Sequence, residues 1–176
     1  PRDAVRVAAA TGITGITGVP PLWNQLASLD WPDEVRRSLR YFATTGGAMR
    51  KPLLDKLRAL FPRARPYLMY GLTEAFRSTY LPPAEVDERP VSIVKSIPNA
   101  EIVVMRDDGT PCDPDEPGEL VHRGALVSLG YWNAPDLTAQ RFRPLTDQLS
   151  PGGRPEMAVW SGDTVKMDED GYLYFV

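Results

Sequence analysis

Three short stretches of the sequence place glycines beside ring, hydroxyl or carboxylate side chains. They are "TTGGAM" (residues 44–49), "YGLTE" (residues 70–74) and "WSGD" (residues 160–163). Gly46 and Gly47 have no Cβ, so a flat ring can lie against the backbone, whose N–H and C=O groups can bind its edge. The first stretch is therefore suited to a planar ligand.

The other two stretches supply groups for the charged part of such a ligand. Tyr70 can cover the second face of a ring, and the Thr73 hydroxyl can donate to an anionic oxygen. Glu74 offers a hard oxygen for Mg²⁺, which binds carboxylates together with phosphate and water. The Asp163 carboxylate can accept two hydrogen bonds from a ribose diol. Together these residue types suit a nucleotide that carries phosphate.

The spacing alone leaves a purely structural interpretation open. Thr73 and Glu74 would then start a helix, with the hydroxyl capping it and the acid complementing its dipole. Gly47 would serve only a turn, and Asp163 would be a turn aspartate. The acidic run at residues 168–170 predicts a solvated hairpin tip.

Composition restricts the class of protein. The chain has 176 residues, of which 43% are hydrophobic and 24% charged, and its net charge is −3. We therefore expect a buried core and no binding to nucleic acid. No apolar run approaches the roughly 18 residues of a membrane span, and no signal segment opens the chain, which predicts a cytoplasmic protein. One cysteine, Cys112, expected in a solvated loop, and one histidine, His122, exclude an internal disulfide and a Cys/His zinc cluster.

The first half of the chain predicts alternating strands and helices. We expect a glycine-rich buried strand within residues 11–20, helices from Pro20 and across residues 32–39, a strand at 39–44, an amphipathic helix at 51–62 and a strand at 64–71. Strand, helix, strand in this order is a βαβ unit with a parallel sheet and a right-handed crossover. Ligands of such sheets gather at the carboxyl ends of the strands, so "TTGG" and "YGLTE" should be neighbours.

The second half predicts mostly antiparallel strands. Asp-Gly pairs at residues 108–109 and 170–171 are hairpin signals, and "GELVHRG" is a further short strand. One short helix, "NAPDLTAQRF", is expected to have Asn133 as its cap and Pro135 in its first turn. We place a domain boundary so that residues 1–88 form an α/β part and residues 89–176 a β-rich part.

The ordered motifs "TTGGAM", "YGLTE", "GELVHRGALVSLGYWNAPDLTAQRF" and "VWSGDTVKMDEDGYLYFV" resemble the large domain of AMP-forming acyl-CoA synthetases. That superfamily includes luciferases and the adenylation domains of peptide synthetases. The amino-acid sequence of these stretches is most similar to a bacterial acyl-CoA ligase subgroup associated with exopolysaccharide and exosortase loci. The resemblance implies an α/β fold: a parallel βαβ part followed by an antiparallel subdomain like a distorted barrel.

The resemblance also implies an activity and its site. In this family a carboxylate attacks the α-phosphate of ATP to give an acyl-adenylate and pyrophosphate, and CoA then displaces AMP. Mg²⁺ assists, and no protein nucleophile is needed. By similarity, Gly46, Gly47 and Ala48 line the adenine, Tyr70 stacks on it, Gly71 lets the nucleotide approach, Thr73 binds the α-phosphate, Glu74 holds Mg²⁺ and Asp163 takes the ribose hydroxyls.

The sequence departs from the family pattern at several places. Thr45 and Ser161 exchange one hydroxyl residue for another, whereas Val91 and Val94 stand where relatives tend to carry a small or polar residue and glycine. The family's glycine-rich lysine loop and its carboxy-terminal lid do not occur within this chain. We therefore expect an internal piece of a ligase that is inactive by itself and exposes sheet edges through which it self-associates.

Two alternatives stay open. One is a non-catalytic nucleotide-binding or interaction module with the same fold. The other is an amino-acid-activating adenylation domain of a peptide synthetase, although no clear aspartate for an α-amino group is present. The apolar stretch "GITGITGVPPLWNQL" favours an acyl or aryl substrate over an amino acid.

Overall fold

The computed structural model describes residues 1–89, 92–145 and 156–176, and these form two compact units. The N-terminal unit contains Pro1–Tyr70 and Leu81–Val91, and the C-terminal unit contains Gly71–Tyr80 and Ser92–Val176. The segment 71–80, which follows a strand of the first unit, thus belongs to the second. The expected division at residues 88 and 89 stays a prediction.

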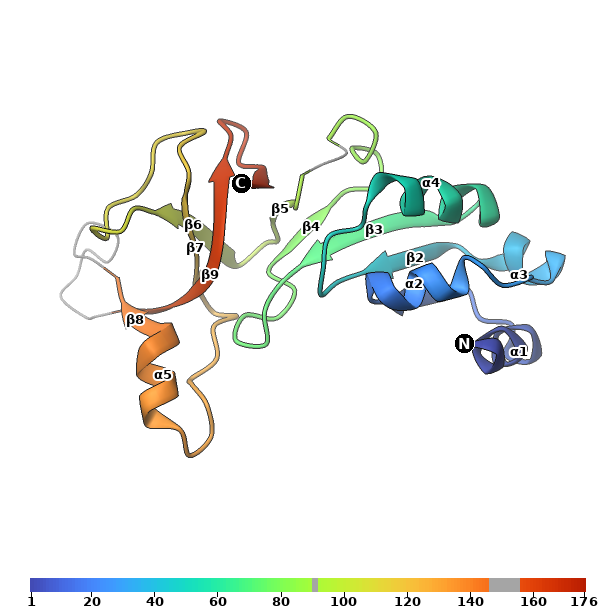
Figure 1. The fold of residues 1–176 in the computed structure, drawn as a ribbon, viewed down its shortest axis with the longest axis horizontal. Helices are drawn as coiled ribbons and strands as arrows, with labels where there is room; N and C mark the ends of the chain where they lie inside the picture. Colours follow the sequence, from blue (N-terminus) through green and yellow to red (C-terminus); the bar gives the residue numbers. More distant parts are fainter. Residues whose placement is uncertain (90–91, 146–155) are drawn as a thin grey trace. The chain divides into compact units, whose positions relative to one another are not determined.

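The N-terminal unit is built on three parallel strands (Figure 1). Its elements are α1 (Arg2–Thr11), β1 (Gly15–Gly18), α2 (Pro20–Leu26), α3 (Asp33–Ser38), β2 (Tyr41–Thr44), α4 (Lys51–Leu60) and β3 (Arg65–Tyr70). Strand β2 pairs with β1 on one side and with β3 on the other. The predicted parallel βαβ arrangement is therefore confirmed.

The strand predicted within residues 11–20 is shorter in the structure than the sequence pattern indicates. Thr11 ends α1, and Gly12 terminates that helix in the left-handed conformation with φ of 62°. Strand β1 keeps only four residues and is half-buried rather than buried. The start of α2 at Pro20 is as predicted, because proline suits the first helical position.

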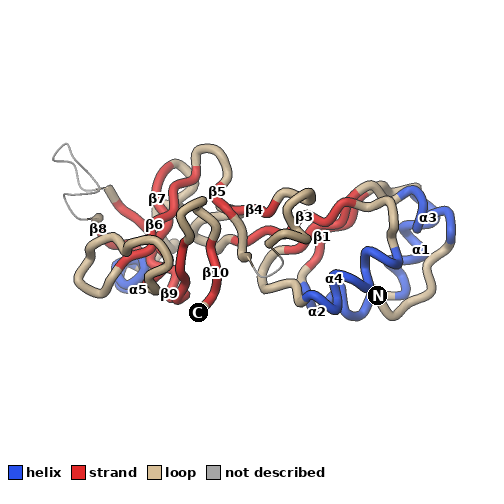
Figure 2. The backbone as a smooth tube through the Cα atoms, turned by 90° about the horizontal axis from the view of Figure 1, so that it is seen from above, coloured by secondary structure: helices blue, strands red, loops and turns tan. Residues whose placement is uncertain are grey.

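Aromatic and leucine side chains form the core of the N-terminal unit. Helix α4 buries Leu53, Leu54 and Leu57, and Figure 2 shows α2 and α4 on the same side of strands β1 and β3. The rings of Trp23 and Phe42 pack edge to face with centroids 5.6 Å apart. This packing fixes β2, and with it the loop that follows β2.

The C-terminal unit is antiparallel, as predicted. The short strand β4 (Thr79–Leu81), whose last residue belongs to the N-terminal unit, pairs with β5 (Lys95–Ser96). The elements that follow are β6 (Ala100–Met105), β7 (Gly118–Gly124), α5 (Pro135–Arg141), β8 (Phe142–Pro144), β9 (Met157–Met167) and β10 (Leu173–Phe175). Strands β6 to β10 form one sheet with the order β10-β9-β7-β6, and β8 pairs with β9. One buried cluster beneath it comprises Met105, Val121, Leu145, Ala158 and Trp160.

Two local predictions for the C-terminal unit need revision. Asn133 is not the cap of α5: the N-cap is Ala134, no side chain caps it, and Asn133 has φ of 51°. The Asp-Gly turn at residues 170–171 joins β9 to β10 as expected, whereas the turn at 108–109 is followed only by an isolated bridge between Met105 and Pro111. Among the residues that the structure describes, no helix is long and apolar enough to cross a membrane.

Candidate functional site

The N-terminal unit presents an accessible glycine loop at the carboxyl ends of its strands. Strands β2 and β3 run parallel with Thr44 opposite Leu68, so the loop after β2 and Tyr70 lie at the same edge of the sheet. Gly46 and Gly47 are exposed and have φ of 74° and 155°, values that favour glycine. This edge has the bare backbone that a planar ring requires.

The end of β2 also holds a buried hydroxyl. Thr44 is 2% exposed, and within the described part of the chain its Oγ1 has no hydrogen-bond partner. The neighbouring Ala43 carbonyl accepts a hydrogen bond of 3.1 Å from Trp23 Nε1. The strand that leads into the glycine loop is thus tied to α2.

Residues 71–78 form a tight irregular loop and contain no helix. A Cβ on Gly71 would lie 2.3 Å from the backbone nitrogen of Arg77, so no side chain fits there. Leu72 N–H donates to the Ala75 carbonyl at 3.1 Å, which closes the loop over Thr73. The interpretation of Thr73 and Glu74 as helix-starting residues is therefore wrong. The Thr73 side chain is exposed, as a phosphate-binding hydroxyl would need to be.

Glu74 is held by the chain segment that precedes α5. Its carbonyl accepts a hydrogen bond of 2.8 Å from Ser128 N–H, and the next residue, Ala75, forms a bridge with Val127. Its carboxylate Oε1 accepts a hydrogen bond from the Tyr131 hydroxyl. This hydrogen bond raises the pKa of Tyr131 above its ordinary value because it stabilises the protonated phenol, and burial and the negative charge of Glu74 act in the same direction.

Asp163 lies in a bulge inside strand β9. Thr164 pairs with Glu119 and Trp160 with Val121, so residues 161–163 all lie opposite a single residue of β7. Gly162 has φ of 80°, and its N–H donates to Glu119 Oε1 at 3.0 Å. The expectation that Asp163 follows a strand in a turn is wrong, because the strand continues on both sides of it. Bulges re-aim side chains, which suits a binding residue.

Arg141 braces this bulge from α5. Its Nη1 donates to the carbonyl oxygens of Trp160 and Ser161 at 3.2 and 2.7 Å. A Cβ on Gly162 would lie 2.9 Å from that same nitrogen, so a side chain there would displace the Arg141 guanidinium, and the positive φ of Gly162 favours glycine independently. The position of Asp163 thus depends on an arginine that sequence reasoning did not select.

The histidine of the chain, His122, is buried in the C-terminal unit. It lies in β7, is 1% exposed, and pairs with Ile102 of β6 and Val159 of β9. Burial lowers its pKa to about 4, and the charges of Asp163 and Glu74 oppose that shift. Glu74 and Asp163, far apart in sequence, are therefore both within electrostatic reach of one neutral imidazole.

Sequence reasoning considered His122 only as a metal ligand. The overlooked signal was its place in "GELVHRG", an apolar strand between two of the chemical motifs. A polar residue flanked by Val121 in such a strand is usually buried and adjusted to its neighbours.

The predicted site residues are distributed over both units. The N-terminal unit contains Gly46, Gly47, Ala48 and Tyr70, and the C-terminal unit contains Gly71, Thr73, Glu74 and Asp163. Within the described ranges no group of three or more His, Cys, Asp or Glu side chains could enclose a metal. Glu74 as a lone, partly exposed carboxylate still fits Mg²⁺, which is commonly held by one or two carboxylates together with substrate phosphates and water.

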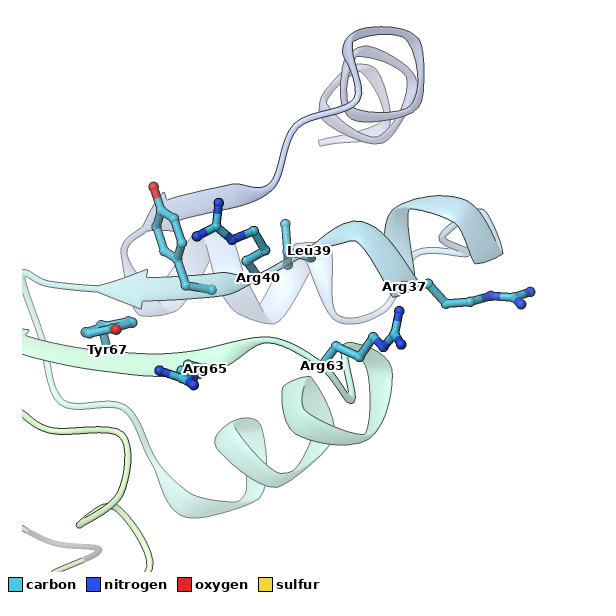
Figure 3. Close-up of a pocket in the computed structure, with 7 residues that line it drawn as sticks. Arg37, Leu39, Arg40, Arg63, Arg65 and Tyr67 are labelled. Atoms are coloured by element: carbon cyan, nitrogen blue, oxygen red, sulfur yellow. The ribbon is translucent and has the colours of Figure 1, made fainter.

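A basic cavity of about 430 Å³ lies away from these residues, at the amino ends of β2 and β3. It is lined by Arg37, Leu39, Arg40, Tyr41, Arg63, Arg65 and Tyr67. The rings of Tyr41 and Tyr67 meet edge to face with centroids 6.1 Å apart. Arg37 and Arg63 point away from Tyr67 (Figure 3). Because Tyr41 pairs with Arg65 at the start of the strands, this cavity is not the nucleotide site predicted at their other end.

Comparisons with known proteins agree with the motifs. The family described as AMP-binding enzyme matches residues 1–132 of the 176. A long-chain-fatty-acid–CoA ligase of Escherichia coli O157:H7 is 32% identical over 182 aligned residues, covering 100% of this chain and 30% of the ligase. The phosphinothricin tripeptide synthetase PhsB of Streptomyces viridochromogenes is 32% identical over 165 residues, covering 94% of this chain and 14% of the synthetase.

A solved structure is similar across the whole chain. It is the o-succinylbenzoate coenzyme A synthetase of Bacillus subtilis in complex with ATP and magnesium ion, which is 25% identical and superposes with a TM-score of 0.77. The match covers 99% of this chain and 33% of that one, so this chain spans about a third or less of each of these relatives. With its α/β fold and the family match over most of its length, the chain belongs to the AMP-binding enzyme family of adenylate-forming enzymes.

Proposed function

We propose that the full-length protein containing this chain activates a carboxylic acid with ATP and transfers the acyl group to CoA. In the first step a carboxylate oxygen bonds to the α-phosphorus, the bond to the β-phosphate oxygen breaks, and pyrophosphate leaves. In the second step the CoA thiol attacks the acyl carbon and AMP leaves. Bound Mg²⁺ would neutralise charge that develops on the phosphate oxygens.

The chain's own residues bind and orient the nucleotide in this proposal. Gly46, Gly47 and Ala48 would lie along the adenine, and Tyr70 would stack on it. Gly71 would leave room for the nucleotide and Thr73 would donate to the α-phosphate. Glu74 would hold Mg²⁺, and Asp163 would bind the ribose hydroxyls. No side chain acts as a nucleophile, and positioning with charge neutralisation carries the reaction.

One observation carries this proposal above the others. In the C-terminal unit Thr73 is exposed in a loop, and Ser128 N–H holds the adjoining main chain of Glu74. Asp163 lies in a bulge of β9 that Arg141 braces. A turn aspartate and a helix-capping pair would need neither this loop nor this bulge, whereas an exposed hydroxyl and two carboxylates on backbone held by distant segments suit a ribose and phosphate site.

The test is carboxylate-dependent exchange of labelled pyrophosphate into ATP by the full-length protein. Glu74→Gln should lower the exchange rate by about 10²- to 10³-fold, the usual cost of one transition-state electrostatic contact. Glu34→Gln is a matched control, because Glu34 is an exposed acid in the first turn of α3. Exchange that persists in the Glu74 variant would contradict the assignment, and no exchange with any carboxylic acid would contradict the activity.

A second candidate substrate is an amino acid, which the similarity to a peptide synthetase favours. Running the exchange assay with fatty, aryl and amino acids separates the two: we expect a fatty or aryl acid to support the fastest exchange. Thioester formation with CoA is then measured separately. Exchange without thioester formation would support the proposed adenylation step and contradict the proposal that CoA is the acceptor.

The isolated 176-residue chain is proposed to be inactive. Calorimetry with AMP tests whether it is instead a self-sufficient nucleotide-binding module. Weak or absent binding agrees with a partial site, whereas tight binding by this chain alone would favour the module.

A further inference from the structure

In the described part of the chain, the Glu74 carboxylate has one hydrogen-bond partner, the side chain of Tyr131. The Glu74 main chain is fixed separately, by the hydrogen bond from Ser128 N–H and by the bridge between Ala75 and Val127. The Tyr131 hydroxyl donates to Glu74 Oε1, so the other carboxylate oxygen, Oε2, takes no part in this hydrogen bond. Backbone placement and carboxylate orientation therefore depend on different contacts.

The ring of Tyr131 is itself held in place. It packs edge to face on Phe142, with ring centroids 5.6 Å apart and an interplanar angle of 85°. Phe142 is 3% exposed and begins β8, which pairs with β9. The phenol thus stands on a buried ring of the antiparallel sheet, although Tyr131 belongs to a loop.

The backbone of Tyr131 is held by helix α5, shown in orange in Figure 1. Tyr131 N–H donates to Thr138 Oγ1 at 2.9 Å, and the same hydroxyl donates to the Ala134 carbonyl at 2.8 Å. Gly130 has φ of 133°, and a Cβ there would lie 2.6 Å from Thr138 Cγ2. The chain approaches α5 so closely that only glycine fits before Tyr131.

Tyr131 is restrained at its ring, at its backbone and at the preceding glycine. Burial of apolar surface does not account for this restraint. Tyr131 is only half-buried, and its neighbours Leu129 and Trp132 are 104% and 92% exposed. The segment therefore gains little from burial, while its one polar side-chain contact is with Glu74. Groups that orient a metal-binding carboxylate commonly alter metal affinity by about 10- to 100-fold when they are removed.

We infer that Tyr131 is a positioning residue that fixes the Glu74 carboxylate through Oε1, so that Oε2 is presented to a divalent cation bound with the nucleotide phosphates. This inference rests on the proposed function of Glu74. It adds a residue from the segment before α5, outside the glycine, Thr-Glu and Ser-Gly-Asp motifs, to the determinants of cation binding.

The test uses Mn²⁺ in place of Mg²⁺ on the full-length protein, with ATP and without a carboxylic acid, so that no turnover occurs. Water-proton relaxation distinguishes Mn²⁺–ATP on the protein from Mn²⁺–ATP in solution. Tyr131→Phe keeps the ring against Phe142 and removes only the hydroxyl. We expect its Mn²⁺–ATP complex to dissociate about tenfold more readily, with a melting temperature close to that of the unmodified protein.

A matched control comes from the same unit. Tyr174 Oη donates to Asp168 Oδ2 at 3.1 Å, the same kind of phenol–carboxylate bond at the β9–β10 turn. Tyr174→Phe should leave Mn²⁺–ATP affinity unchanged. Thr138→Val gives a second route, because it removes the acceptor of Tyr131 N–H and keeps the phenol; a loss in the same direction is expected, smaller than that of Tyr131→Phe.

Glu74→Gln separates the inference from the function on which it rests. If Glu74→Gln weakens Mn²⁺–ATP binding and Tyr131→Phe does not, the positioning role is overturned and the role of Glu74 stands. If Glu74→Gln leaves affinity unchanged, the cation-binding role of Glu74 fails first. Support requires that Tyr131→Phe weaken binding and that the double variant be no weaker than Glu74→Gln alone.

Discussion

The free energy of unfolding should depend on His122 at mildly acidic pH. Burial lowers the pKa of His122 to about 4, against 6.5 for an unperturbed histidine. Between these values the unfolded chain binds a proton at His122 that the folded chain does not. Stability is therefore lost as pH falls from 6.5 toward 4. The histidine accounts for a loss of about 2–3 kcal/mol between pH 7.5 and pH 4.5, out of a typical total of about 5–15 kcal/mol.

Urea unfolding at pH 7.5 and at pH 4.5 measures this loss, with His122→Val as the comparison. Valine suits a buried strand position and does not titrate. Folding also lowers the pKa of some carboxylates, such as Asp87 beside Arg58 and Glu116 beside Arg106. Their contribution to the free energy of unfolding is likewise lost as pH falls. They are present in both proteins, so the difference between the two pH-dependent losses isolates His122.

The chain has one histidine, so its imidazole resonances can be assigned without ambiguity in an NMR titration. We expect no protonation of the ring in the folded protein above about pH 5. Equal losses of stability in the two proteins, or a ring that titrates near its ordinary pKa, would refute the placement of His122 between β6 and β9.

Three further substitutions test other parts of the structure. Trp23→Phe deletes the donor to the Ala43 carbonyl and leaves a small void, so urea unfolding should show a loss of about 1–3 kcal/mol. Arg141→Met removes the brace of the Gly162 bulge, and AMP affinity of the full-length protein by calorimetry should fall about tenfold, or 1.4 kcal/mol. Val94 is buried with φ of 108°, so Val94→Gly should be more stable than Val94→Ala by about 1 kcal/mol, the reverse of the usual order.

Local sequence patterns were sufficient for most of the fold. The leucine spacing of α4, with Pro52 at its start, indicates an amphipathic helix from the local sequence alone. Strands β2 and β3 follow from short apolar runs on either side of that helix, and a crossover of this kind requires a parallel sheet. The antiparallel pairing of β9 with β10 follows from the Asp-Gly turn between them.

The errors fall where distant segments decide local structure. Thr73 and Glu74 have the composition of a helix start, yet a bridge from Ala75 to Val127 holds them in a loop. Asp163 has the flanking glycine of a turn, yet pairing with β7 on both sides keeps it in a strand. Neither partner lies within 20 residues in sequence, so no local pattern could have indicated them.

The departure from the family pattern at Val94 has a structural counterpart. The family resemblance implies glycine at this position, and the backbone of Val94 adopts a positive φ that disfavours β-branched residues. Val94 is buried, pairs with Leu173 and accepts a hydrogen bond from Leu173 N–H, which holds the strained residue. Val91, the other departure in this loop, lies outside the described residues.

Gly71 allows the proposed roles of the residues in the C-terminal unit to be tested apart from those in the N-terminal unit, because the C-terminal unit begins there. A Cβ at Gly71 would lie 2.3 Å from Arg77 N and 2.8 Å from Arg77 Cα, and backbone atoms cannot rotate aside as a side chain can. Gly71→Ala must therefore move the loop that carries Thr73 and Glu74, while β3 and its pairing with β2 need not change.

The expected result of Gly71→Ala is a loss of pyrophosphate exchange of about 10²-fold or more, together with weaker Mn²⁺–ATP binding by the full-length protein. Gly12→Ala is the matched control, because Gly12 has φ of 62° but no atom within 4 Å of an added Cβ. This substitution should lower the free energy of unfolding by about 1 kcal/mol and leave activity unchanged. If Gly71→Ala lost stability but retained full Mn²⁺–ATP affinity, the cation would not depend on the loop of Thr73 and Glu74.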